Sequence, residues 1–245
     1  MHTDKPAPRF QAEKRRVVLL PIGSCEQHGP FLPIDTDLRI AALLAERVAN
    51  LLSQHVVLLP ALPFSCAHEH RGLGTIALDI STVSAFVHNV ARSLRSWETP
   101  FLLVLLNWHG GNDLLGALAT EITSTEFLPC AAIPSPAQVG KAWDESGMTA
   151  AKDIHAGAIE TAIIRAYWPE LVVEPIPHAA HCEPHISPAK VQPVLQALGT
   201  YAATVQGIWG APEDADASRG RELLEKLSQD IHTQILRLLE LVNDM

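Results

Sequence analysis

The chain has 245 residues, of which 47% are hydrophobic, and its formal net charge at pH 7 is −9. This length is enough for one domain with a large core, so we expect residues 1–245 to form a single domain with residues 1–15 as a loose N-terminal arm. The negative charge argues against a protein that binds nucleic-acid phosphates through a basic face. We find no run of about 18 apolar residues, so no membrane span is expected.

Cysteine and histidine usage narrows the chemistry further. The four cysteines are scattered and form no Cys-x-x-Cys pair, so we expect reduced thiols and a cytoplasmic location. Twelve histidines is a high count, and many of them stand beside carboxylates or glycines in expected loops. This pattern indicates metal chemistry.

Apolar runs that are typical of buried strands alternate along the chain with stretches whose apolar residues recur at helical spacing. Strands are expected at 17–22, 56–62, 101–106 and 129–133. Helices are expected at 37–52, 81–97, 114–126, 156–167 and 222–242. Between them, 134–152 has the composition of an irregular insertion and 169–193 that of a Pro-rich loop. The alternation predicts an α/β fold with a mainly parallel sheet and helices on both faces.

Acidic and histidine side chains cluster directly after the expected strands and at the start of one helix. The clusters are Glu26/His28/Asp37, His68/Glu69/His70, His109 and His155/Glu160. In a doubly wound sheet such loops meet at the carboxyl edge, where ligands bind. Carboxylates mixed with imidazoles suit Zn²⁺, Mn²⁺ or Fe²⁺. The sequence therefore predicts a metal site at this edge.

A pair of divalent ions about 3.5–4 Å apart needs a bridging carboxylate, and Asp37 is the natural candidate. Such a site activates water and polarises a carbonyl, which is chemistry that hydrolyses amides. The plainer alternative is that a single histidine is a hydrogen-bonded loop residue. A nucleophilic Ser24 lacks the Gly-x-Ser-x-Gly frame, and Cys25 with His28 is a weaker alternative.

Several segments resemble signatures of the creatininase (creatinine amidohydrolase) family. The longest is 21–41, which reads Pro-Ile-Gly-Ser-Cys-Glu-Gln-His-Gly-Pro-Phe-Leu-Pro-Ile-Asp-Thr-Asp-Leu-Arg-Ile-Ala. Shorter matches are Glu69-His70 with Gly74-Thr75, Asn107-Trp-His-Gly-Gly-Asn112, His155-Ala-Gly with Glu160-Thr161, and Gly207-Ile-Trp-Gly-Ala-Pro212 with Gly220. Together these matches span about 17–220 of the chain.

The resemblance implies a three-layer α/β/α sandwich, one or two divalent metal ions (Zn²⁺, Mn²⁺ or Fe²⁺) and a homo-oligomer, commonly a hexamer. It implies that Asp37 bridges the ions and that His155 carries protons or contacts the substrate. The metal ligands implied are Glu26, His28, Asp37, His109 and Glu160. The residues expected to contact the substrate are Phe31, His70 and Trp108.

One departure from the family pattern bears on the substrate. Creatininase has a metal-binding acid two residues after the third-cluster histidine, and here that position is Gly111. Glu160 is therefore expected to supply the missing carboxylate. The chain is similar to the Gly-Gly members of the family, which include the peptidase of mycofactocin maturation and formamide deformylases. This departure disfavours creatinine as the substrate.

The leading hypothesis is a metal-dependent amidohydrolase that uses an activated water to cleave the C–N bond of a small-molecule or short-peptide substrate, such as a cyclic amide, a formamide or a peptide. Two alternatives stay open at this point. One is a metal-dependent isomerase or dehydratase of a specialised pathway, and the other is a non-catalytic relative that binds a small molecule.

Overall fold

The computed structural model describes residues 17–53, 56–97, 101–145, 153–178, 196–200, 204 and 206–243. The expected N-terminal arm, residues 1–15, lies outside the described residues. In the part of the chain that is described, no helix combines the length and the apolar character needed to cross a membrane.

A four-stranded parallel sheet forms the centre of the molecule. The strands are β1 (Val17–Ile22), β2 (Val56–Leu58), β3 (Leu102–Asn107) and β4 (Cys130–Ile133), in the spatial order β2-β1-β3-β4. β1 pairs with β3 along its whole length, from Val17 opposite Leu102 to Ile22 opposite Asn107. The polar residues that follow β1 and β3 therefore leave the sheet side by side.

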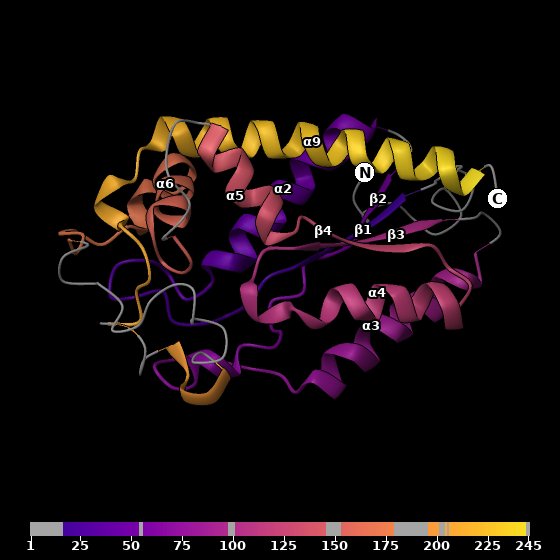
Figure 1. Ribbon diagram of the computed structural model, residues 1–245, viewed down its shortest axis with the longest axis horizontal. Helices are drawn as coiled ribbons and strands as arrows, with labels where there is room; N and C mark the ends of the chain where they lie inside the picture. The colour runs from indigo at the N-terminus through magenta and orange to yellow at the C-terminus, as the bar shows by residue number, and fades with distance from the viewer. Residues whose placement is uncertain are drawn as a thin grey trace.

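Helices cover both faces of the sheet, as Figure 1 shows. On one face lie α2 (Thr36–Leu52), α5 (Pro136–Glu145), α6 (Ala158–Tyr167) and α9 (Ala217–Asn243). On the other face lie α3 (Ile80–Arg95) and α4 (Leu114–Thr125). Short 3-10 turns occur at His68–His70, Gly110–Asn112, Pro169–Leu171 and Pro212–Asp214. The predicted three-layer α/β/α sandwich with a parallel sheet is confirmed.

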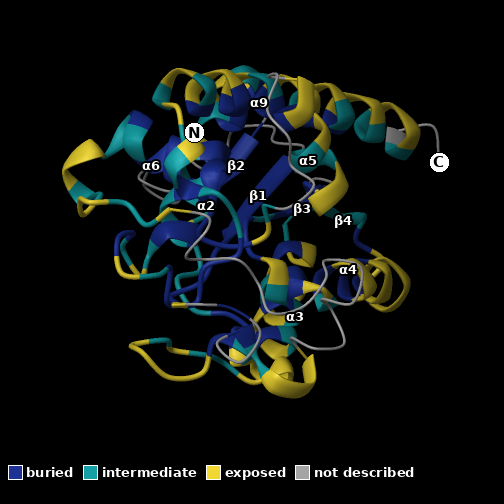
Figure 2. Ribbon diagram, turned by 60° about the vertical axis from the view of Figure 1, so that its left-hand side comes forward, coloured by how far each residue is buried: buried dark blue, intermediate teal, exposed yellow. Residues whose placement is uncertain are grey.

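Alternation along the strands divides the core between these two layers. In β1, Val17 and Leu19 pack with the α2, α6 and α9 side, whereas Val18 and Leu20 pack with the α3 and α4 side. All of β1 is buried, so the strand is apolar at nearly every position rather than at every second one. Figure 2 shows β1 and β3 as buried elements between the helix layers.

The second strand is shorter than predicted, because the structure ends β2 at Leu58 instead of Leu62. Pro60 has no N–H with which to continue the ladder. The chain rejoins β1 only at Leu62, whose N–H donates to the Pro21 carbonyl at 2.9 Å. The expectation of a strand over 56–62 is therefore wrong beyond Leu58.

The prediction of an irregular insertion over 134–152 is wrong for Pro136–Glu145, which forms α5. A reciprocal capping box starts this helix: the Ser135 N–H donates to Gln138 Oε1 at 2.9 Å, and the Gln138 N–H donates to Ser135 Oγ at 3.3 Å. A Ser-x-x-Gln sequence with proline at the first helical position is a known start signal. The buried face of α5 carries Ala142 and Trp143.

The last helix begins at Ala217, before the predicted start at 222. The extra turn contains Gly220, which lies directly against α6: a Cβ at this position would come 2.4 Å from the carbonyl oxygen of Ala162. The close approach of α9 to α6 therefore depends on a glycine, and α6 is the helix that carries Glu160.

We expect Gly220→Ala to destabilise the protein by about 1–3 kcal/mol, because the new methyl group overpacks a backbone contact that has no room to yield. Urea-induced unfolding measures the change. Gly116→Ala is the matched control, since Gly116 is an exposed glycine in α4 and nothing lies within 4 Å of the point where a Cβ would stand. There alanine should stabilise by about 0.4–1 kcal/mol. Equal effects at the two positions would contradict the proposed contact.

Candidate metal centre

The loop after β1 folds back over the carboxyl end of the sheet and buries three polar side chains. The Glu26 N–H donates to the Ile34 carbonyl at 2.8 Å, which closes the loop on itself. Glu26 and His28 are fully buried, and Asp37, in the first turn of α2, is 1% exposed. Burial of two carboxylates this close together needs strong compensation by positive charge.

One group of donor atoms gathers around His109, which follows β3. His109 Nδ1 lies 3.2 Å from Glu26 Oε2 and 3.1 Å from Asp37 Oδ2. The other ring nitrogen, Nε2, lies 2.7 Å from the carbonyl oxygen of Cys66. Because a carbonyl only accepts, Nε2 carries a hydrogen. In the neutral ring, Nδ1 is then a lone pair directed at the two carboxylates.

A second group gathers around His28 on the other side of Asp37. His28 Nε2 lies 3.3 Å from Asp37 Oδ1 and 3.6 Å from Glu160 Oε2, which comes from the first turn of α6. His28 Nδ1 donates to the Glu26 carbonyl at 3.1 Å, so Nε2 is the lone-pair nitrogen of the neutral ring. Asp37 thus presents one carboxylate oxygen to each group.

Several atoms of these groups have no hydrogen-bond partner within the described part of the chain, although they are buried. They are both carboxylate oxygens of Glu26, His28 Nε2 and Asp37 Oδ1. Buried polar atoms in folded proteins are almost always satisfied. Four lone-pair atoms that converge with no hydrogen-bond donor between them fit divalent cations. The mixed set of oxygen and nitrogen atoms suits Zn²⁺, Mn²⁺ or Fe²⁺.

The electrostatics of the protein alone also favour positive charge here. Burial by itself lowers the pKa of His28, but the carboxylates of Asp37 and Glu160 outweigh it and raise that pKa well above its usual range. The pKa of His109 is raised in the same way, against burial, by Glu26 and Asp37. The carboxylates thus stabilise two positive charges, one on each side of Asp37.

The two carboxylates respond differently to this environment. Burial tends to raise the pKa of Asp37, yet His28 and His109 hold it well below its usual range. Burial dominates at Glu26 and raises its pKa to about 7. Asp37 therefore stays ionised between the two imidazoles.

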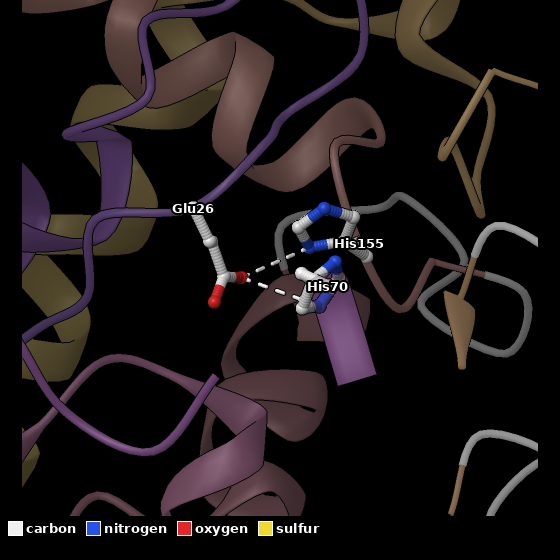
Figure 3. Close-up of side chains that lie close together, drawn as sticks. All are labelled: Glu26, His70 and His155. Atoms are coloured by element: carbon white, nitrogen blue, oxygen red, sulfur yellow. Dashed lines mark ion pairs between the residues drawn. The ribbon is translucent and has the colours of Figure 1, made fainter. Parts of the chain in front are cut away.

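Two further histidines face the remaining oxygen of Glu26, and Figure 3 shows both rings beside it. His70 Nε2 lies 3.4 Å and His155 Nδ1 lies 3.6 Å from Glu26 Oε1. Burial, followed by the charge of His109, lowers the pKa of His70 to about 3. Burial, followed by His70 and His28, puts the pKa of His155 well below its usual range. Both rings are therefore neutral, and a neutral imidazole has a nitrogen that accepts a proton.

The structure thus brings together most of the residues that the sequence singled out. His68, Phe31 and Trp108 are the exceptions. His68 is exposed, and its Nε2 lies 3.5 Å from Asp79 Oδ1. Phe31 and Trp108 are buried in the core between the sheet and the α2, α6 and α9 layer, at 1% and 7% exposure. Contact of Phe31 and Trp108 with a substrate stays a prediction.

Asp153 was missed at the sequence level. It accepts a hydrogen bond from the Ile159 N–H at 3.0 Å and so holds the start of α6, the helix that positions Glu160. Burial, followed by the nearby Glu160 charge, raises the pKa of Asp153 to about 7. An acidic residue shortly before a predicted helix is a recognised N-terminal signal, and it could have been found that way.

The packing around Gly111 leaves no room for the acidic side chain that creatininase has at this position. A Cβ at 111 would lie 2.1 Å from Glu69 Oε1, 2.4 Å from His109 Nε2 and 2.7 Å from the carbonyl oxygen of Cys66. Glu69 Oε1 itself lies 3.5 Å from His109 Nε2. The carboxylate of Glu69 and the ring of His109 fill the space that a side chain at 111 requires.

We expect Gly111→Ala to lower the free energy of unfolding by about 1–3 kcal/mol, because the methyl group must displace the His109 ring or the Cys66 carbonyl. Gly110→Ala, one residue earlier in the same turn, is the control, since nothing lies within 4 Å of its Cβ position. Its effect should stay within about 0.5 kcal/mol. Chemical unfolding of both variants tests this, and a harmless Gly111→Ala would refute the packing described here.

Comparison with known proteins shows the family to which the chain belongs. The creatininase family, described as creatinine amidohydrolase, matches residues 4–235. The mycofactocin precursor peptide peptidase of Mycobacterium ulcerans (strain Agy99) is 31% identical over 229 residues, which cover 90% of this chain and 84% of that protein. The creatinine amidohydrolase of Pseudomonas putida is 23% identical over 175 residues, which cover 64% of this chain and 66% of that protein.

Solved structures share the fold. Creatinine amidohydrolase (creatininase) superposes with a TM-score of 0.71 at 19% identity, covering 97% of this chain and 97% of that one. A creatininase mutant of the Zn–Zn type gives 0.72 at 20% identity, covering 97% and 98%. A family match over nearly the whole chain identifies the protein as a hydrolase of the creatininase (creatinine amidohydrolase) family.

Proposed function

We propose that the protein is a metal-dependent amidohydrolase that cleaves a C–N bond of a short peptide. The observation that carries this proposal is the Asp37 carboxylate, whose two oxygens face two separate donor groups, at 3.3 Å from His28 Nε2 and 3.1 Å from His109 Nδ1. A carboxylate between two such groups would be able to bridge the ions of a two-metal site.

Glu26, Asp37 and His109 would hold one ion, and His28, Asp37 and Glu160 would hold the other. Creatininase is known in Zn–Zn and Mn forms, and the oxygen and nitrogen donors here suit either metal as well as Fe²⁺. When bound, such ions activate a water molecule and polarise the carbonyl of the scissile amide.

His155 is the residue that we expect to move the proton. Its Nδ1 faces the site 3.6 Å from Glu26 Oε1, and the depressed pKa of its buried ring keeps that nitrogen able to accept. Water supplies an oxygen to the carbonyl carbon while its proton passes to His155 Nδ1. The C–N bond then breaks, and the same proton goes to the leaving nitrogen.

A peptide is favoured over creatinine by two observations. The acid of creatininase is replaced by Gly111, and the space beside it is filled by Glu69. The similarity to the mycofactocin precursor peptide peptidase also extends over more of the chain and at higher identity than the similarity to the creatinine amidohydrolase. We therefore infer a peptide C–N bond as the target.

Asp37→Asn should remove the bridge and with it most of the bound metal, measured by inductively coupled plasma mass spectrometry after dialysis. Even residues that only support metal ligands cost about 10–100-fold in metal affinity or activity when changed, so we expect a loss of at least about 100-fold in rate. Asp35→Asn makes the same chemical change two residues away, where the carboxylate is partly exposed and pairs with Arg39 at 2.8 Å. It should keep metal and activity. Retention of both by Asp37→Asn would exclude the bridging role.

The substrate class is tested with protein that is stripped by a chelator and reloaded with Zn²⁺ or Mn²⁺. We expect the reloaded protein to cleave the mycofactocin precursor peptide into two products whose masses sum to the peptide plus one water, and the stripped protein to be inactive. Creatinine should stay unchanged. A product of unchanged mass would identify an isomerase, and turnover of creatinine in preference to the peptide would overturn the substrate assignment.

A further inference from the structure

Gln27 stands in sequence between Glu26 and His28, the proposed metal ligands. Its side chain instead contacts His70 and His155. It is 4% exposed. Its Nε2 lies 2.9 Å from His70 Nδ1, 3.2 Å from the Gly207 carbonyl oxygen and 3.1 Å from His155 Nε2. One amide thus contacts both of the imidazoles that face Glu26 Oε1.

The orientation of this amide is fixed by the backbone. The Gly29 N–H donates to Gln27 Oε1 at 3.0 Å, which identifies the oxygen end of the group. The nitrogen end therefore faces His70 and Gly207, and it has two hydrogens to donate. The Gly207 carbonyl accepts one of them, and His70 Nδ1 accepts the other.

The position of the proton on His70 follows directly. A neutral ring that accepts at Nδ1 carries its hydrogen on Nε2. That nitrogen lies 3.5 Å from the hydroxyl oxygen of Thr200 and 3.4 Å from Glu26 Oε1, so His70 turns a donor toward both.

The backbone carbonyl of Gln27 holds His155 in the other orientation, with Nδ1 rather than Nε2 toward the site. His155 Nε2 lies 2.8 Å from the Gln27 carbonyl oxygen, which only accepts, so Nε2 carries the hydrogen. Because His155 Nε2 carries this hydrogen, it cannot also accept from Gln27 Nε2, which lies 3.1 Å away, and the two amide hydrogens are left for His70 and Gly207. His155 Nδ1 is left as a lone pair that faces the site.

We propose that Gln27 is a positioning residue that sets the two imidazoles to opposite tasks, with His70 Nε2–H as a hydrogen-bond donor and His155 Nδ1 as the proton acceptor. This inference rests on the proposed hydrolytic function and states which ring nitrogen donates a hydrogen bond and which accepts a proton in that reaction. It also removes one competing metal site: Glu26, His70 and His155 have ligand atoms within 4.8 Å of one another, but His70 Nε2 carries a hydrogen and cannot coordinate.

Gly207 makes this arrangement possible. A Cβ there would come 2.2 Å from Gln27 Oε1, and its φ of +75° lies in the left-handed region that favours glycine. A segment distant in sequence therefore supplies both the carbonyl that takes one amide hydrogen and the space in which the amide fits.

The protonation pattern is measurable without turnover. Solid-state ¹⁵N spectra of histidine-labelled, Zn²⁺-loaded protein separate a bare ring nitrogen from a protonated one, and the spectra of His70→Gln and His155→Gln assign the signals. We expect bare Nδ1 and protonated Nε2 in both rings. A proton on Nδ1 of either ring in the unsubstituted protein would overturn the proposal.

Gln27→Glu tests the cause. A carboxylate cannot donate, so Nδ1 of His70 should gain a proton while the metal content stays unchanged. With the precursor peptide as probe, kcat should fall by about 10–100-fold, as for other supporting residues, with little change in KM. Gln229→Glu, the same change on an exposed position of α9, should alter neither the spectrum nor kcat.

An unchanged His70 signal in Gln27→Glu would contradict the role of Gln27. Failure of the Zn²⁺-loaded protein to cleave the peptide would instead count against the proposed function, and the spectra of the unsubstituted protein would still decide the tautomers. The two inferences therefore fail by different observations.

Discussion

Two buried carboxylates that share one imidazole nitrogen are the constraint on which the rest of the structure depends. Glu26 and Asp37 both face His109 Nδ1, at 3.2 and 3.1 Å. Taking such charges out of water costs several kcal/mol for each ion unless positive charge compensates it. The parallel pairing of β1 with β3 brings the two loops together at one edge, and the first turn of α2 supplies Asp37. The fold thus concentrates negative charge where the proposed ions would be held.

The orientation of the histidines is set largely by main-chain carbonyls. His28 Nδ1 faces the Glu26 carbonyl, His109 Nε2 faces that of Cys66 and His155 Nε2 faces that of Gln27. Each carbonyl takes the hydrogen of one ring nitrogen and leaves the other nitrogen to the site. A partner of this kind fixes both the tautomer and the ring plane. Because the supporting groups belong to the backbone, their geometry depends on loop conformation rather than on the identity of the residue that provides the carbonyl.

Because the supporting carbonyls are placed by loop conformation, the sequence predicts some parts of the fold and the site but not others. Apolar runs and helical spacing predict β1, β3 and the main helices, and the rule that ligands bind at the carboxyl edge brings Glu26 and His109 together. Elsewhere, neighbouring residues favour different structures. Within 136–145 the glycine favours a loop, although the capping box at Ser135 indicates the start of a helix. The role of Gln27 is not readable from sequence, because one of its two acceptors is the Gly207 carbonyl, 180 residues away, and a carbonyl leaves no residue signature.

Glu26 connects the two halves of the site, since one oxygen faces His109 and the other faces His70 and His155. Only a carboxylate serves both. A glutamine at this position would have to turn its NH₂ either toward the His70 Nε2–H, where two donors would meet, or toward the ion position, where a ligand oxygen would be lost. The carboxylate that faces His109 on one side therefore also faces His70 and His155 on the other. This arrangement couples the placement of the proposed metal ligands to the placement of the proposed proton carrier.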